Sequence, residues 1–171
     1  MGPIMKKYIS LLALLLSIGT YAQDQTIPNF LEKWEHSKNY LIEVARAMPV
    51  EKYDYKPTER EMSFKEQLQH IQQNMEWLGN SYFNKKEGTI VIDRNVKEQT
   101  ITNLTEAFDL VSEAVKAFPP QELNTPVEFF AGEKTKLQML NLLQDHVTHH
   151  RGQLIVYLNL NNVEPPKYIG W

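Results

Sequence analysis

The chain has 171 residues, of which 42% are hydrophobic and 23% charged, with a net charge of -3 and a pI near 6.0. These values are ordinary for one globular domain, and they provide no basic patch of the kind that nucleic-acid binding requires. The absence of cysteine excludes disulfides, thiolate ligands and a cysteine nucleophile, so a metal ion here would need His, Asp or Glu.

The N-terminal segment has the organisation of a secretory signal peptide. Lys6 and Lys7 precede an apolar run from Ile9 to Gly19, and Thr20-Tyr21-Ala22 supplies small residues at both ends of a cleavage triplet. The run is shorter than the about 20 residues of a membrane-spanning helix. We therefore predict a signal peptide at residues 1–22, of which residues 1–4 could be extra because Met5 is a more natural start. The remaining residues, 23–171, would form one exported domain, periplasmic or secreted, with no stable membrane span after cleavage.

Four segments of this domain have helical periodicity bounded by capping residues or prolines. We expect helices from Thr26 to Pro49, from the Ser63 capping box to about Phe83, from Asn103 to Pro119, and from Thr135 to Asn161. Their Met and aromatic stripes should form the core. The links, roughly 50–62, 84–102 and 119–134, are long enough for crossovers, so the direction of each helix cannot be inferred. Thr89–Ile92 and Val127–Phe130 could be extended pieces that cover an end of the bundle.

His146 and His150 are the most informative residues of the chain. Residues four apart on a helix differ by only about 40° in direction, so the two imidazoles can converge on one point. Both lie within the apolar arc and should point into the core, whereas His149 lies about 60° from His146, at the edge of the arc. A buried imidazole needs partners for its ring nitrogens. Two interpretations remain open: a core pair hydrogen-bonded to Gln or Tyr side chains, and half of a metal site.

An open metal site would need a third ligand, for which His36 and His70 remain. His70 lies about 110° from the centre of the apolar face of its helix, on a side shared with Asn74 and Trp77. Taken alone, this is the position of a half-exposed histidine. His36 lies on a polar part of the first helix, and we expect it to be solvated.

Two segments, Ser63–Ile71 and Asp145–Gln153, resemble the DinB/YfiT-like superfamily of metal-binding four-helix bundles in sequence and in their placement on the second and fourth helices. The ending Pro-Pro-Lys-Tyr-Ile-Gly-Trp is similar to one branch of it. The resemblance covers essentially the whole domain and implies an all-α four-helix bundle in which His70, His146 and His150 bind a divalent metal ion. It also implies a homodimer, to whose surface Phe129, Phe130 and Trp171 could contribute.

Three neutral imidazoles would leave coordination positions open for water or substrate, and they suit zinc or nickel, with iron or manganese as alternatives. The resemblance then implies a metal-dependent enzyme acting on a small molecule, either hydrolase-like or a thiol-dependent S-transferase. Predicted export favours the hydrolase-like enzyme, because thiol cofactors are scarce outside the inner membrane. The alternatives are a non-catalytic module that binds a metal or small ligand, and a bundle without metal.

No residue stands out as a general base. Gln153 and Asn74 could orient a ligand or a water molecule, although each is equally credible as polar packing. Arg151 and His149 flank the motif, and we expect them to be solvated or at an interface. Gly152 in mid-helix costs about 1 kcal/mol relative to Ala, which predicts that a neighbouring group comes close.

Overall fold

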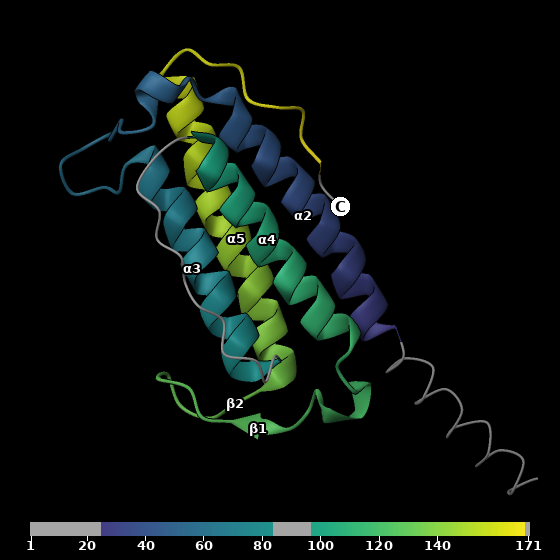
Figure 1. Cartoon of the computed structure of the whole chain (residues 1–171). Helices are drawn as coiled ribbons and strands as arrows, with labels where there is room; N and C mark the ends of the chain where they lie inside the picture. Colours follow the sequence, from purple (N-terminus) through teal and green to yellow (C-terminus); the bar gives the residue numbers. More distant parts are fainter. Residues whose placement is uncertain (1–24, 84–96, 170–171) are drawn as a thin grey trace, which may run out of the picture.

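A computed structural model describes residues 25–83 and 97–169, and in these ranges four long helices form a bundle (Figure 1). The helices are α2 (Thr26–Ala47), α3 (Phe64–Tyr82), α4 (Lys97–Lys116) and α5 (Lys136–Leu160). None of the described helices is both long and apolar enough to cross a membrane. The predicted signal peptide and the predicted extended piece Thr89–Ile92 lie outside the described residues.

The helices follow an up-down-down-up order. Both α2 and α3 pack against α4 and α5, so α2 and α3 occupy diagonal positions (Figure 1). Lys97, at the start of α4, donates a hydrogen bond of 2.8 Å to the carbonyl of Met48, just after the end of α2. The rings of Phe83 and Phe118, which follow the ends of α3 and α4, are in contact. The neighbouring helices α3 and α4 therefore run parallel.

Two of the predicted helix starts are confirmed by complete capping boxes. Ser63 and Glu66 exchange side-chain and backbone hydrogen bonds at the start of α3, and Thr135 and Gln138 do the same at the start of α5. The start predicted at Asn103 is wrong, because α4 is already helical at Lys97.

The reason for this error is visible in the contacts along α4. The Asn103 side chain accepts a hydrogen bond from Gln99 one turn earlier, and Ile101 is buried in the core. The apolar face of the helix therefore extends past the apparent cap.

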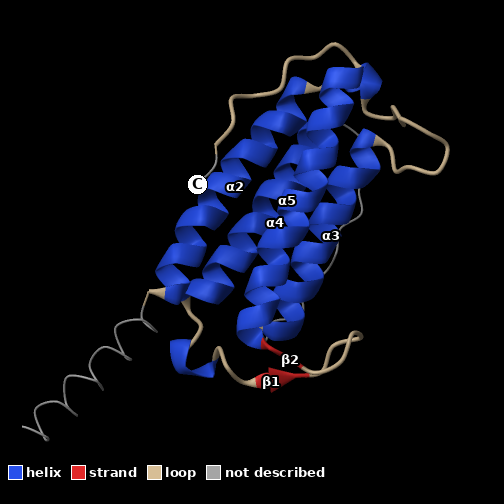
Figure 2. Cartoon of the chain, turned by 180° about the vertical axis from the view of Figure 1, so that it is seen from behind, coloured by secondary structure: helices blue, strands red, loops and turns tan. Residues whose placement is uncertain are grey.

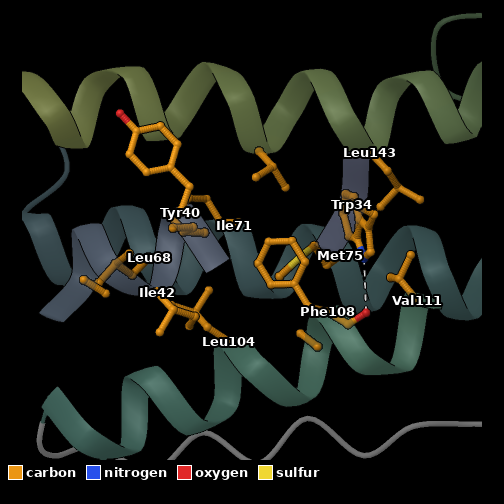
Figure 3. Packing of buried hydrophobic residues seen from close by; sticks show 14 of the residues in the cluster. Trp34, Tyr40, Ile42, Leu68, Ile71, Met75, Leu104, Phe108, Val111 and Leu143 are labelled. Atoms are coloured by element: carbon orange, nitrogen blue, oxygen red, sulfur yellow. Dashed lines mark hydrogen bonds between the residues drawn. The ribbon is translucent and has the colours of Figure 1, made fainter. Parts of the chain in front are cut away.

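The core is formed by the apolar stripes that the periodicity predicts (Figure 3). Trp34 is fully buried, where its ring packs between Phe30 and Phe108. Its indole N–H donates a hydrogen bond of 3.1 Å to the Phe108 carbonyl, so the polar atom of this large side chain has a partner. Leu41 of α2 and Ile71 of α3 are also fully buried.

A short hairpin covers the end of the bundle where α3 ends and α5 begins (Figure 2). Strand β1 (Pro126–Val127) pairs antiparallel with β2 (Lys134–Thr135), which leads directly into α5. Of the extended piece predicted at Val127–Phe130, only Val127 lies in a strand. Phe129 and Phe130 lie in the loop, and the ring of each stacks with the ring of Trp77 of α3. We call these three residues the aromatic cluster.

Candidate metal centre

Three histidines converge between α3 and α5. His70 lies on α3, and His146 and His150 lie one turn apart on the neighbouring α5. One ring nitrogen from each lies within 4.8 Å of the others, and the ring centroids are 4.4 to 4.9 Å apart. The fold therefore brings together the three predicted ligands, and this group could hold a metal ion.

The closest approach in this group is between the Nε2 atoms of His70 and His146, which are 3.1 Å apart. Two nitrogens bound to one tetrahedral zinc ion, with bonds of about 2.0–2.1 Å, would be separated by roughly 3.3 Å. A direct hydrogen bond has a similar length. The observed separation is thus compatible with a shared ion as well as with a hydrogen-bonded pair.

The histidines of α5 are held in the form that binds metals. His150 is buried and His146 is half-buried. Burial first, and the neighbouring imidazoles second, lower the pKa of His146 to about 3 and that of His150 to about 4, although a hydrogen bond to Gln153 opposes the second shift. Both side chains are neutral at pH 7, and a neutral imidazole has a lone pair available for a metal ion.

Hydrogen bonding alone accounts for His150 but not for His146. The Nδ1 of His150 lies 2.6 Å from the Gln67 side-chain oxygen and 3.1 Å from that of Gln153. By contrast, the Nδ1 of His146 is buried and has no hydrogen-bond partner in the described part of the chain. An orphaned buried polar atom costs about 1–3 kcal/mol. Hydrogen bonding within the described residues thus leaves one buried nitrogen of His146 unsatisfied, and an ion bound at Nε2 would not change this. The fit to a divalent ion rests on the three convergent imidazole donors.

Gln67 is the functional candidate that the sequence reasoning missed. It is 1% exposed, and its amide nitrogen lies 3.5 Å from the hydroxyl of Tyr157, which donates a hydrogen bond of 2.9 Å to the Met62 carbonyl. Gln67 precedes His70 by three residues, which places it about 60° away on the same helix. The spacing argument used for His146 and His150 would have found it. Gln153, which the sequence analysis named as a residue that could orient a ligand, contacts His150.

The other flanking residues lie outside the histidine group. His149 is exposed, and its ring nitrogen lies 3.3 Å from the Gln153 amide. Asn74 is half-buried, and its side-chain oxygen has no partner in the part of the chain that the structure describes. His36 was predicted to be solvated, but it is half-buried and its Nδ1 has no partner among the described residues.

Two expectations about α5 are wrong. Arg151 is buried, with its guanidinium 4.8 Å from the centre of the Tyr40 ring, because its side of α5 packs against α2. One guanidinium nitrogen of Arg151 has no hydrogen-bond partner within the described ranges. Gly152 does not face a close neighbour, since a Cβ added there would meet nothing within 4 Å.

Comparisons with known proteins identify relatives of this chain. The model of the DinB family matches residues 21–169. The protein YjoA of Bacillus subtilis (strain 168), which is described as uncharacterized, is 28% identical over 153 residues, covering 85% of this chain and 95% of its own length.

Solved structures share the fold. The crystal structure of the DinB-like protein YjoA from Bacillus subtilis superposes with a TM-score of 0.68 at 20% identity, over 82% of this chain and 96% of that one. A DinB-like protein from Bacillus cereus ATCC 10987 gives a TM-score of 0.67 at 16% identity, over 82% and 95% of the two chains.

Proposed function

This chain belongs to the DinB family, and we propose that it is a metal-dependent enzyme, hydrolase-like in its chemistry, that acts on a small molecule. Its metal ion would be held by His70, His146 and His150. The observation that carries the proposal is the convergence of three ring nitrogens within 4.8 Å of one another. The neutral state of His146 and His150 supports it.

The composition of the ligand group supports an enzyme over a closed binding module. Within the described residues, no Asp or Glu joins the three histidines, whereas a closed site would complete its coordination with a further protein ligand. Imidazole ligands suit zinc, nickel and iron, and carboxylate-rich sites suit manganese. We therefore propose zinc or nickel as the ion, with iron or manganese as alternatives.

The residues of the site have separable roles in this proposal. A divalent ion held by three neutral ligands supplies positive charge that polarises whatever occupies its remaining positions. His70 from α3 and the pair from α5 hold the ion between two helices. Asn74, one turn from His70, has a buried side-chain oxygen with no hydrogen-bond partner among the described residues. In this proposal it orients a ligand or a water molecule.

The proposal is tested by elemental analysis of protein purified without an affinity tag. Wild type should contain about one equivalent of zinc or nickel, and His146→Ala should lose it. His149→Ala is the matched control, because it removes an exposed imidazole of the same motif and should retain the metal. Metal-free wild type that takes up none of zinc, nickel, iron and manganese would overturn the proposal.

Activity separates the chemical alternatives once the metal is established. The loaded protein is assayed for hydrolysis of ester and amide substrates, and in parallel for transfer of small thiols to an electrophile. Metal-dependent hydrolysis that is lost in His146→Ala supports the proposed enzyme. Thiol transfer alone would replace it with an S-transferase, and the absence of turnover on either panel would favour a binding module.

We also propose that the protein is exported and forms a homodimer. Export rests on the signal-peptide pattern of residues 1–22, and the N-terminal sequence of the protein isolated from its natural host tests it: the mature chain should begin at Gln23. The dimer rests on the aromatic cluster, in which Phe130 is 86% and Trp77 43% exposed. Aromatic side chains are enriched in protein interfaces. Light scattering should show a dimer for wild type and a monomer for Phe130→Ser.

A further inference from the structure

We propose that Gln67 is a positioning residue that fixes the tautomer of His150, so that the ring offers an unprotonated Nε2 to the metal site. This inference rests on the proposed function, because it explains how one of the proposed ligands is prepared for the ion. It is carried by a relay of buried hydrogen bonds that runs from Met62, before α3, to Tyr157 on α5, then to Gln67 on α3 and finally to His150 on α5.

The relay begins at a group that can only accept. The carbonyl of Met62 has no proton, so the hydroxyl of Tyr157, 2.9 Å away, must donate to it. With its single proton used, the Tyr157 oxygen can only accept a further hydrogen bond. The group next to it is the Gln67 amide nitrogen at 3.5 Å, which carries two protons. The Tyr157 hydroxyl therefore orients the Gln67 amide, with its nitrogen toward Tyr157 and its oxygen toward His150.

The orientation of Gln67 decides which nitrogen of His150 is protonated. Its side-chain oxygen lies 2.6 Å from the Nδ1 of His150, and the side-chain oxygen of Gln153 lies 3.1 Å from the same atom. An unprotonated Nδ1 would bring a lone pair against two acceptors. A neutral imidazole carries one N–H, so a proton on Nδ1 leaves Nε2 as the only atom of His150 that can bind a metal ion.

The burial of the relay makes this preference strong. Gln67 is 1% exposed and Tyr157 4%, so water cannot easily replace a lost partner. Hydrogen-bond partners that orient metal-binding histidines commonly change metal affinity by about 10–100-fold when they are removed. We expect the same range for Gln67.

The first test reads the tautomer directly in metal-free protein. Long-range ¹H–¹⁵N NMR correlation spectra of histidine-labelled wild type should show His150 protonated at Nδ1. In Gln67→Met, which keeps the length of the side chain but cannot accept a hydrogen bond, the preference should weaken or reverse. A wild-type His150 protonated at Nε2 would overturn the inference.

The second test measures zinc affinity by competition with a chromophoric chelator. Gln67→Met should bind zinc about 10–100-fold more weakly than wild type, and Gln67→Glu, which still accepts from Nδ1, should recover most of the affinity. Gln72→Met is the matched control, because this buried glutamine of α3 donates to Glu76 and not to a histidine. Equal zinc affinity in wild type and Gln67→Met would refute the positioning role.

Tyr157→Phe keeps the inference testable where Gln67→Met fails to fold, because it leaves Gln67 in place and removes only the group that orients its amide. It should weaken the Nδ1 preference and lower zinc affinity by less than Gln67→Met does. An unchanged tautomer and affinity in Tyr157→Phe would refute the relay. The failure of the proposed function looks different: no variant would bind zinc or nickel, while His150 in metal-free wild type would still be protonated at Nδ1.

Discussion

The metal-free protein should lose stability as the pH falls from 7.5 to 5, because two histidines are neutral in the fold and become charged on unfolding. The pKa of His146 is lowered to about 3 and that of His150 to about 4, from an ordinary value of 6.5. Between pH 6.5 and about 4 the unfolded chain therefore binds more protons than the folded chain. The free energy of unfolding therefore rises with pH. The contribution of the two histidines is fully present above pH 6.5 and is lost as the pH falls.

The size of the loss follows from the unfolded pKa alone, as long as the folded values lie below 5. At pH 5 a histidine with a pKa of 6.5 is nearly fully protonated in the unfolded chain, which destabilises the fold by about 2 kcal/mol per residue. Two such residues would cost about 4 kcal/mol. His146 is only half-buried, and solvent screening reduces its share, so we expect about 2–3 kcal/mol in total.

The assay is urea unfolding of chelator-treated protein at pH 7.5 and at pH 5. His146→Asn removes one of the two titrating groups, so it should lose about half as much stability as wild type over this range. His149→Asn, which changes an exposed neighbour, should behave as wild type. Glu66, whose pKa is lowered to about 2 by hydrogen bonds from Ser63 and then by Lys56, responds below the tested range. Identical pH dependence in wild type and His146→Asn would refute the reasoning.

Further predictions concern other positions of the bundle. Gly152→Ala should stabilise the protein by about 1 kcal/mol in urea unfolding, because the added Cβ meets nothing within 4 Å. Gly79→Ala should gain less or destabilise, because its Cβ would lie 3.1 Å from Leu110 and Val111, and equal gains at both glycines would contradict this reading. In thermal unfolding, Arg151→Met should have a free energy of unfolding within about 1 kcal/mol of the wild-type value, or above it. The lost contact with Tyr40 is offset by removal of a buried nitrogen that has no hydrogen-bond partner among the described residues. A loss of several kcal/mol in Arg151→Met would show that the guanidinium has a partner.

Helical periodicity predicted the parts of this molecule that depend on one helix at a time. The buried stripes, the capping boxes at Ser63 and Thr135, and the inward direction of His146 and His150 all follow from residue spacing along one helix. Asn103 shows the limit of this approach, because a capping pattern can occur inside a helix when the buried face continues before it. Whether the helix begins at Asn103 or earlier depends on the burial of the residues before it, and that burial depends on packing against α2 and α3.

Periodicity along one helix could not predict which other helix each of its faces packs against. His70 becomes a ligand candidate only because α3 packs against α5, and the resemblance to a family suggested this pairing where spacing alone did not. Arg151 was expected to be solvated or at an interface because its neighbour, Tyr40, lies on a helix far away in sequence. Gln67 is different: its spacing from His70 on α3 pointed to it, but its contacts with His150 and Tyr157 depend on the packing of α3 against α5.

The proposed ligand set has a consequence for when a metal ion can be acquired. His70 and His146 are 76 residues apart in sequence, and they belong to helices that are not consecutive in the up-down-down-up order. A chain in which α3 has not docked on α5 has only the His146 and His150 pair, and two ligands on one helix hold an ion more weakly than three. Tight binding therefore follows tertiary assembly. In this proposal, the ion that the protein carries would be set by the metals available where folding is completed, and not by those available where the chain is synthesised.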